Sequence, residues 1–99
     1  DVVIGPNTTV SQYSYICTAS HDYSSVKAGN PALMPLISAP IVIEKNVWVA
    51  ADVFIGPGVT IGEESVVLAR SSVIKDIGDC SVASGSPISK IVSRSYKVA

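Results

Sequence analysis

The chain has 99 residues, a formal net charge of −1, one histidine and two cysteines, and 47% of its residues are hydrophobic. This length allows one small domain. The near-neutral charge argues against a general nucleic-acid binder, and so few cysteines and histidines exclude a disulfide framework or a Cys/His zinc site. No apolar run approaches the roughly 18 residues of a membrane-spanning helix, and no basic start with an apolar core marks a secretory signal. We therefore expect a cytoplasmic protein that does not insert into membranes and that gains stability from oligomerisation.

Bulky aliphatic residues recur every six positions in two blocks of the chain. A second series, mostly serine, threonine and valine, lies four positions after each of them. A period of six suits neither an amphipathic helix nor one alternating strand, but it suits short strands joined by turns. Three such edges would form a triangular coil of about 18 residues, and stacked coils would hydrogen-bond as parallel sheets. The first series is Ile4, Val10, Ile16, Ile37, Ile43, Val49, Ile55, Ile61, Val67 and Val73, and the second is Thr8, Ser14, Ser20, Ile41, Val47, Val53, Val59, Ser65, Ser71 and Ile77.

The turns between the edges are predicted by residue type. Several members of the second series follow a residue that tolerates a left-handed backbone or a tight turn. Strands of an ordinary β-sandwich would not keep ten positions in one register, so the sequence favours stacked coils. The residues that precede the second series in this way are Asn7, Asn46, Asp52, Gly58 and Asp76.

The two blocks are out of phase, which divides the chain into coils, a loop and a tail. The first series should continue from Ile16 to position 22 but resumes at Ile37, so we predict an inserted loop, and a loop of this length is usually functional. Further on the repeat fades, with Asp79 at an aliphatic position and Ala83 still fitting the second series. The repeat is already present at the start, so either N-terminal coils are missing or a partner covers that edge. The predicted divisions of the single domain 1–99 are a first coil over 1–21, a loop over about 22–36, later coils over 37–84 and a tail over 85–99.

The repeat resembles that of the hexapeptide-repeat acyltransferases, which fold as left-handed parallel β-helices. Residues 40–76, PIVIEKNVWVAADVFIGPGVTIGEESVVLARSSVIKD, resemble the C-terminal half of the galactoside, maltose and xenobiotic O-acetyltransferase branch. Residues 18–23, TASHDY, resemble its catalytic-histidine segment, and the chain is most similar to the acetyltransferases of colanic acid and related exopolysaccharide biosynthesis. The resemblance implies an acetyl-CoA-dependent O-acetyltransferase that acts on a sugar or polysaccharide precursor. It also implies a homotrimer with a groove at each subunit boundary.

His21 is the candidate catalytic residue. Transfer of an acetyl group from a thioester to a hydroxyl needs a base for the hydroxyl proton, and histidine ordinarily titrates near neutrality. His21 follows a second-series position, so its side chain should face outward at the start of the loop, where the resemblance places the general base. Asp22 could orient the imidazole, contact the acceptor or cap the loop. Tyr23 could pack against the acceptor or be an ordinary loop aromatic.

The resemblance places acetyl-CoA along the later coils. Trp48 should point outward, either as a groove wall near the pantetheine arm or the acceptor, or as packing at a trimer interface. The resemblance implies backbone contacts to the pantetheine near Ala51 and Ala69, Ile74 beside the distal arm, and Lys75 and Lys90 near the phosphates. A basic end suits the phosphates, since five basic residues oppose two acidic ones from position 70 onward.

Two other functions are compatible with a β-helix of this kind. The γ-type carbonic anhydrases share the same helix, but they need three histidines around one zinc ion. One histidine in each chain cannot supply them, so we expect no metal. A non-enzymatic β-helix, kept as a scaffold or assembly module without an acceptor site, remains the alternative.

Overall fold

A computed structural model of the protein describes residues 1–24 and 30–97. Its strands are two to four residues long, because a turn follows each short extended segment. Within these ranges no helix is long and apolar enough to cross a membrane. The elements are β1 (Val2–Ile4), β2 (Thr9–Val10), β3 (Tyr15–Ile16), β4 (Ala19–His21), the 3₁₀ turn η1 (Pro31–Leu33), β5 (Leu36–Ser38), β6 (Ile41–Ile43), β7 (Trp48–Val49), β8 (Phe54–Ile55), β9 (Thr60–Ile61), β10 (Val66–Val67), β11 (Ser72–Val73), β12 (Ser81–Ser84) and β13 (Lys90–Ser93).

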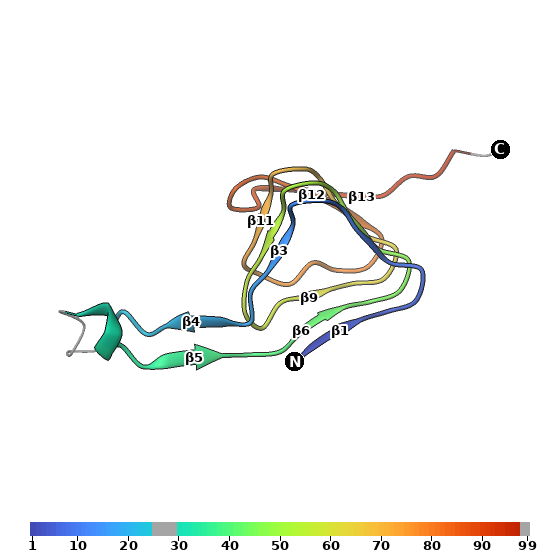
Figure 1. Ribbon diagram of the computed structural model, residues 1–99. Helices are drawn as coiled ribbons and strands as arrows, with labels where there is room; N and C mark the ends of the chain where they lie inside the picture. Colours follow the sequence, from blue (N-terminus) through green and yellow to red (C-terminus); the bar gives the residue numbers. More distant parts are fainter. Residues whose placement is uncertain (25–29, 98–99) are drawn as a thin grey trace.

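The strands form three sheets that are the faces of a triangular prism (Figure 1). Strands β1, β6 and β9 form the first face, β2, β7, β10, β12 and β13 form the second, and β3, β8 and β11 form the third. Strands β4 and β5 form a separate antiparallel pair outside these three sheets, and β13 is antiparallel to β12. Every other strand pairs in parallel with the equivalent strand one coil away. This arrangement confirms the predicted all-β, left-handed parallel β-helix of hexapeptide repeats.

The first series fills the centre of the prism. Val10, Val49 and Val67 follow one another in register on the second face, and the other two faces carry equivalent columns. The side chains of both series become fully buried once a coil is covered above and below, which explains why an unbroken column of β-branched residues is needed. The core residues are Ile41, Ile43, Val47, Val49, Val53, Ile55, Val59, Ile61, Val67, Val73, Ile77 and Ala83.

The turns repeat one backbone conformation at each corner. The residue before most second-series positions has a positive φ, as the residue types predicted for Asn7, Asn46, Asp52 and Gly58. Asp76 is not among these residues, because the last coil departs from the period. The non-glycine residues with φ between 49° and 63° are Asn7, Tyr13, Asn46, Asp52, Glu64, Arg70 and Cys80.

Hydroxyl groups of the second series join consecutive coils. The Thr8 hydroxyl donates to the carbonyl of Glu44 and accepts from the N–H of Val47, at 2.6 and 3.1 Å. Ser14 makes the same pair of bonds to Ala50 and Val53. Each hydroxyl therefore satisfies one carbonyl and one N–H that the turn of the next coil leaves without a ladder partner. The sequence indicated small residues at the corners but not this bridging role.

The last coil is shorter than the repeat by two residues. Val67 lies opposite Val49 at a spacing of 18, whereas Ala83 lies opposite Val67 at a spacing of 16. Ile77 is bridged to Ile61, also 16 residues earlier. Ile77 and Ala83 therefore continue the first series and not the second, and Asp79 lies outside the core because the chain reaches the first face two residues early.

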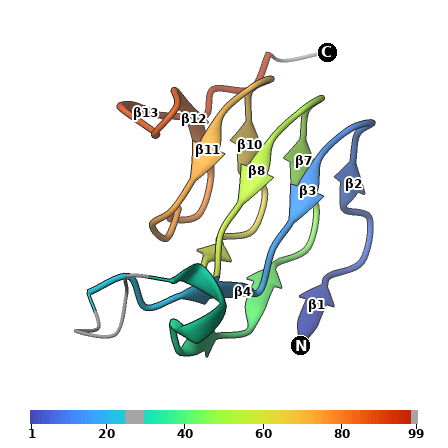
Figure 2. The ribbon, with the colours of Figure 1, turned by 60° about the vertical axis from the view of Figure 1, so that its left-hand side comes forward.

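The inserted segment, which contains β4, η1 and β5, leaves the prism between the third and first faces, and we call it the arm. It points to the left in Figure 1 and comes forward in Figure 2. The prediction that the first series resumes at Ile37 is wrong. Ile37 lies in β5, opposite Ser20 of the antiparallel strand β4, and is 48% exposed. The coil resumes in β6, where Ile43 lies opposite Ile4. The insertion is longer than predicted at both ends, because it includes the paired strands β4 and β5. Residues 25–29 of the predicted loop lie outside the described ranges.

Candidate functional site

His21 is the last residue of β4, the strand that leads away from the prism into the arm (Figure 1). It pairs with Leu36 of β5, and its side chain is exposed, as predicted. The imidazole Nδ1 lies 3.2 Å from the carbonyl oxygen of Met34. The structure thus places the ring of the candidate base against a backbone group from the returning half of the arm.

The contact with Met34 favours one of the two neutral tautomers of the His21 imidazole. A carbonyl oxygen can only accept, so the hydrogen bond requires that Nδ1 be protonated in the neutral ring. The Nε2 atom of His21 then carries the free lone pair. A nitrogen in this state can accept a proton from a hydroxyl group that approaches the end of the arm.

Asp22 and Tyr23 follow the histidine, and the structure separates their roles. The Asp22 carboxylate accepts hydrogen bonds from the backbone N–H of Ser24, at 3.1 Å, and from the Ser24 hydroxyl. The Asp22 N–H donates to the carbonyl of Pro35 at 2.8 Å. These contacts favour the capping interpretation of Asp22, because its carboxylate stabilises the turn that leaves the strand. The Tyr23 side chain is 82% exposed.

Trp48 lies on the second face, away from the arm. Its side chain is 47% exposed, and the indole N–H donates to the Ser11 hydroxyl of the preceding coil at 3.0 Å. Strand β4 leaves the prism from the edge between the other two faces (Figures 1 and 2). One chain therefore does not bring the candidate base and this candidate wall together.

Ala51 and Ala69 lie at the edge between the second and third faces. They line a hollow of about 570 Å³ together with the turns of three successive coils. The Ala51 carbonyl accepts from the N–H of Arg70 at 3.0 Å, so this carbonyl is already used within the prism. The remaining lining residues are Gln12, Tyr13, Asp52 and Arg70.

Ile74 and Lys75 line a second hollow, of about 520 Å³, near the end of the last coils. Its other wall is formed by Pro87, Ile88, Ser89 and Ile91, and the candidate Lys90 lies in this segment without lining the hollow. Ser72 holds this segment in place, since its N–H donates to Gly85 and its carbonyl accepts from Ile88, at 2.9 and 3.1 Å. The candidate cofactor residues are thus divided between two hollows and the face that carries Trp48.

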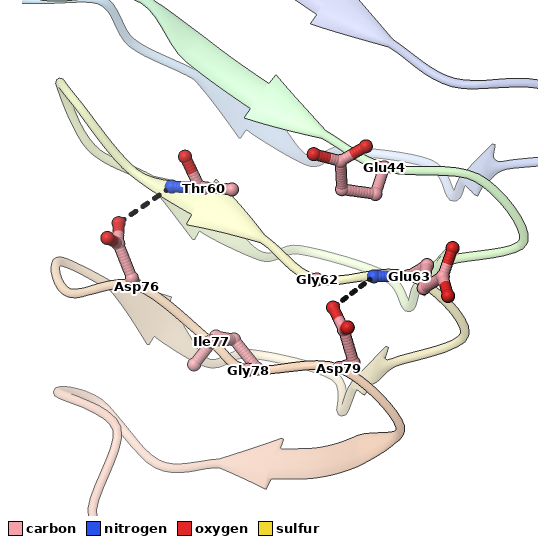
Figure 3. A pocket seen from close by; sticks show the side chains of 8 residues that line it. All are labelled: Glu44, Thr60, Gly62, Glu63, Asp76, Ile77, Gly78 and Asp79. Atoms are coloured by element: carbon pink, nitrogen blue, oxygen red, sulfur yellow. Dashed lines mark hydrogen bonds between the residues drawn. The ribbon is translucent and has the colours of Figure 1, made fainter.

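An acidic hollow of about 540 Å³ was missed at the sequence level (Figure 3). Two of its carboxylates accept backbone hydrogen bonds, Asp76 from Thr60 at 2.8 Å and Asp79 from Glu63 at 3.0 Å. Both replace strand-ladder contacts where the last coil is shortened, which is a structural role. Among the described residues, no group of three His, Cys, Asp or Glu side chains could hold a metal ion. The signal for this hollow was Asp79 at an aliphatic position.

A clasp formed by Arg94, Tyr96 and Glu64 was also missed. The Arg94 guanidinium donates to the Glu64 carbonyl at 2.7 Å and lies 4.6 Å from the centre of the Tyr96 ring. The Tyr96 hydroxyl donates to the Glu64 carboxylate at 2.9 Å. This hydrogen bond, with a smaller contribution from desolvation, raises the pKa of Tyr96. The clasp fixes the tail that follows β13 against the third coil.

These features define a hexapeptide-type β-helix with a histidine-bearing arm, and the similarity to known proteins agrees with them. No family model matches the chain. It is 44% identical over 87 residues to a protein named as a candidate colanic acid biosynthesis acetyltransferase, WcaF of Escherichia coli K12, covering 88% of this chain and 44% of WcaF. It is 41% identical over 87 residues to the galactoside O-acetyltransferase of the same organism, covering 88% of this chain and 38% of that protein.

A solved structure shows the same fold. The chain matches a hexapeptide-repeat acetyltransferase of Vibrio cholerae complexed with acetyl-CoA at a TM-score of 0.83 and 34% identity, covering 94% of this chain and 49% of that one. The chain belongs to the hexapeptide-repeat acetyltransferase family. It spans less than half the length of these relatives.

Proposed function

We propose that the protein is an acetyl-CoA-dependent O-acetyltransferase that acts on a hydroxyl of a sugar or polysaccharide precursor, with His21 as the general base. The observation that carries this proposal is the hydrogen bond from His21 Nδ1 to the Met34 carbonyl, which leaves Nε2 free on an exposed arm. The acetyl-CoA complex of the Vibrio cholerae relative supports the choice of acyl donor. The galactoside O-acetyltransferase supports a sugar acceptor.

In this proposal His21 accepts one proton at Nε2 and later releases it from the same atom. The Nε2 lone pair accepts the proton of the acceptor hydroxyl while the hydroxyl oxygen attacks the thioester carbonyl carbon. A C–O bond forms, the C–S bond breaks, and the imidazolium returns the proton to the departing thiolate. The Met34 carbonyl stabilises the imidazolium, because its hydrogen bond with Nδ1 becomes charge-assisted when the ring is protonated.

We further propose a homotrimer in which the arm of one chain approaches the hollows of its neighbour. The arm exposes Leu33, Leu36 and Ile37, which have little to pack against within one chain. The separation of His21 from Trp48 and from the hollow at Ala51 and Ala69 supports a site completed by a second copy. Concave sites of this kind commonly form where subunits meet.

The cofactor contacts proposed in such a groove are those that the family resemblance implies. Ile74 and Lys75 line one hollow, where they would supply an apolar surface and positive charge for phosphates. Lys90 would add positive charge from the segment that follows Pro87. Trp48 and the backbone near Ala51 and Ala69 would contact the pantetheine arm, and Asp22 and Tyr23 would lie near the acceptor. A cytoplasmic location and a role in polysaccharide biosynthesis stay predictions from the sequence.

The test combines cofactor binding with transfer. We expect millimolar acetyl-CoA to raise the melting temperature, and transfer to be detected in a screen of galactosides, maltose, nucleotide sugars and lipid-linked oligosaccharides. The His21→Ala variant should lose transfer by about 100-fold or more while still binding acetyl-CoA. Absence of any thermal shift with acetyl-CoA and CoA would favour the scaffold alternative. Undiminished transfer by His21→Ala would overturn the role of the histidine.

A further inference from the structure

We propose that Asn30 is a positioning residue that holds the Met34 carbonyl against His21 and thereby selects the imidazole tautomer needed for proton transfer. The inference rests on the proposed function of His21. It concerns a side chain that does not touch the histidine and that acts through the backbone of the arm.

Asn30 caps the short 3₁₀ turn that precedes Met34. Its side-chain oxygen accepts from the N–H of Ala32 at 3.0 Å, and its carbonyl accepts from the N–H of Leu33 at 2.9 Å. Asparagine is among the best residues for this position, since its side chain satisfies an N–H that the turn leaves free. Pro31 follows it at the first turn position, where proline is favoured because its φ is already fixed and it has no N–H to satisfy.

Met34 lies between two fixed points. Upstream, the capped turn η1 ends at Leu33. Met34 precedes Pro35, so it is restricted to extended backbone and cannot continue the turn. Downstream, the Pro35 carbonyl accepts from the N–H of Asp22 at 2.8 Å, which extends the antiparallel pairing of the arm beyond His21. The direction of the Met34 carbonyl is therefore set by the cap on one side and by the strand pair on the other.

The pairing of β4 with β5 holds only the C-terminal end of the segment 30–35. The hydrogen bond between His21 and Met34 is exposed, so water competes with it whenever the carbonyl moves. Without the Asn30 side chain, the Ala32 N–H loses its partner and η1 keeps only the backbone bond from Leu33 to the Asn30 carbonyl, so the turn loosens and the Met34 carbonyl is held less firmly against Nδ1. The imidazole then exchanges its proton between the two nitrogens, and the fraction with a free Nε2 lone pair falls.

The tautomer can be read directly, because His21 is the only histidine in the chain. Long-range ¹H–¹⁵N correlation spectra of the whole protein assign which ring nitrogen is protonated. We expect mainly the Nδ1–H form in the wild type, a shift toward Nε2–H in Asn30→Ala, and recovery in Asn30→Ser, which keeps a capping oxygen without adding charge. The prism lies elsewhere, so the melting temperature should be the same in all three proteins.

The kinetic consequence is confined to turnover. We expect kcat of Asn30→Ala to fall about fivefold, because the loss of one cap has a free-energy cost and the rate depends exponentially on that cost. The KM for acetyl-CoA should be unchanged. An Nε2–H wild type, or equal tautomer populations in wild type and Asn30→Ala, would overturn this inference and leave the His21→Ala test of the proposed function intact. A tautomer shift without any loss of transfer would support the role of Asn30 and count against His21 as the base.

Discussion

The Ser65 hydroxyl donates a hydrogen bond to the Gly78 carbonyl at 2.6 Å from a side chain that is fully buried. The same oxygen accepts from the N–H of Ser81 at 3.0 Å. One small side chain thus satisfies two backbone groups of the last coil, as Thr8 and Ser14 do between the first and second coils. The last coil, which is short by two residues, depends on this bridge.

We therefore expect Ser65→Ala to lower the free energy of unfolding by about 1–3 kcal/mol, because a buried carbonyl and N–H lose their partner. Chemical denaturation with urea would measure the change. Thr8→Ala is the matched control, since it removes an equivalent pair of bonds at a half-buried position, where water can replace them more easily than at Ser65. Equal losses in the two variants would contradict the importance of burial.

Gly62 is expected to resist substitution although its backbone needs no unusual conformation. A Cβ atom at this position would lie 2.5 Å from the backbone nitrogen of Asp79, in the next coil. Gly62→Ala should therefore lower stability by about 1–3 kcal/mol, because the coils would have to separate locally. The measurement is thermal or urea unfolding.

The control for Gly62 is Gly56, which occupies the equivalent place after an aliphatic residue. A Cβ atom there would meet only the Phe54 ring, at 3.4 Å, and looser contacts beyond it. We expect Gly56→Ala to change stability by less than about 0.5 kcal/mol. A larger loss at Gly56 than at Gly62 would contradict the proposed dependence on coil spacing.

The clasp of Arg94, Tyr96 and Glu64 should respond to alkaline pH. The pKa of Tyr96 is raised because its hydroxyl donates to the Glu64 carboxylate, so the folded protein holds this proton more tightly than the unfolded chain. The stabilisation is therefore fully present below about pH 10, the ordinary tyrosine pKa, and is lost as the pH rises through the higher folded value.

Melting temperatures of the wild type and Tyr96→Phe should converge as the pH rises above that range, with the wild type more stable at neutral pH. Difference absorbance near the phenolate band would follow the titration itself. A constant difference in melting temperature from neutral to alkaline pH would show that the hydrogen bond does not contribute.

Trp48 is the only tryptophan, so its fluorescence distinguishes the two interpretations of its exposed side chain. If it forms part of the cofactor groove, saturating acetyl-CoA should change the emission at constant protein concentration. Trp48→Phe should then raise the KM for acetyl-CoA several-fold, because part of the apolar wall is lost. An emission that depends on protein concentration but not on acetyl-CoA would assign the residue to subunit packing alone.

The sequence predicted the prism well because its physical requirement is periodic. Each edge of a coil repeats the same two inward-facing positions, so the period of six could be read without any knowledge of contacts. The same reasoning failed at Ile37, which has the right residue type and spacing but lies in the arm. It failed again beyond Val73, because a shortening of two residues moves Ile77 into the other series and leaves no trace in composition.

The candidate site was predicted less completely than the fold. The exposure of Trp48 followed from its place beside the inward-facing Val47. The exposure of His21 was predicted for the wrong reason, because Ser20 is itself exposed and both residues lie in β4, outside the prism. The carbonyl of Met34 could not be predicted as the partner of His21, because the antiparallel return of the arm brings together residues 13 apart that no repeat relates. The bond between Trp48 and Ser11 likewise depends on the length of the insertion between their coils.

The arm begins and ends at almost the same place, because the Ala39 N–H donates to the Thr18 carbonyl at 2.9 Å. The stack on either side continues in register across this junction, with Val2 opposite Ile41. The arm is thus a detachable module whose length is not limited by the stack. Arms of different length and sequence could be joined to the stack at this junction, by evolution or by grafting, without redesign of the core.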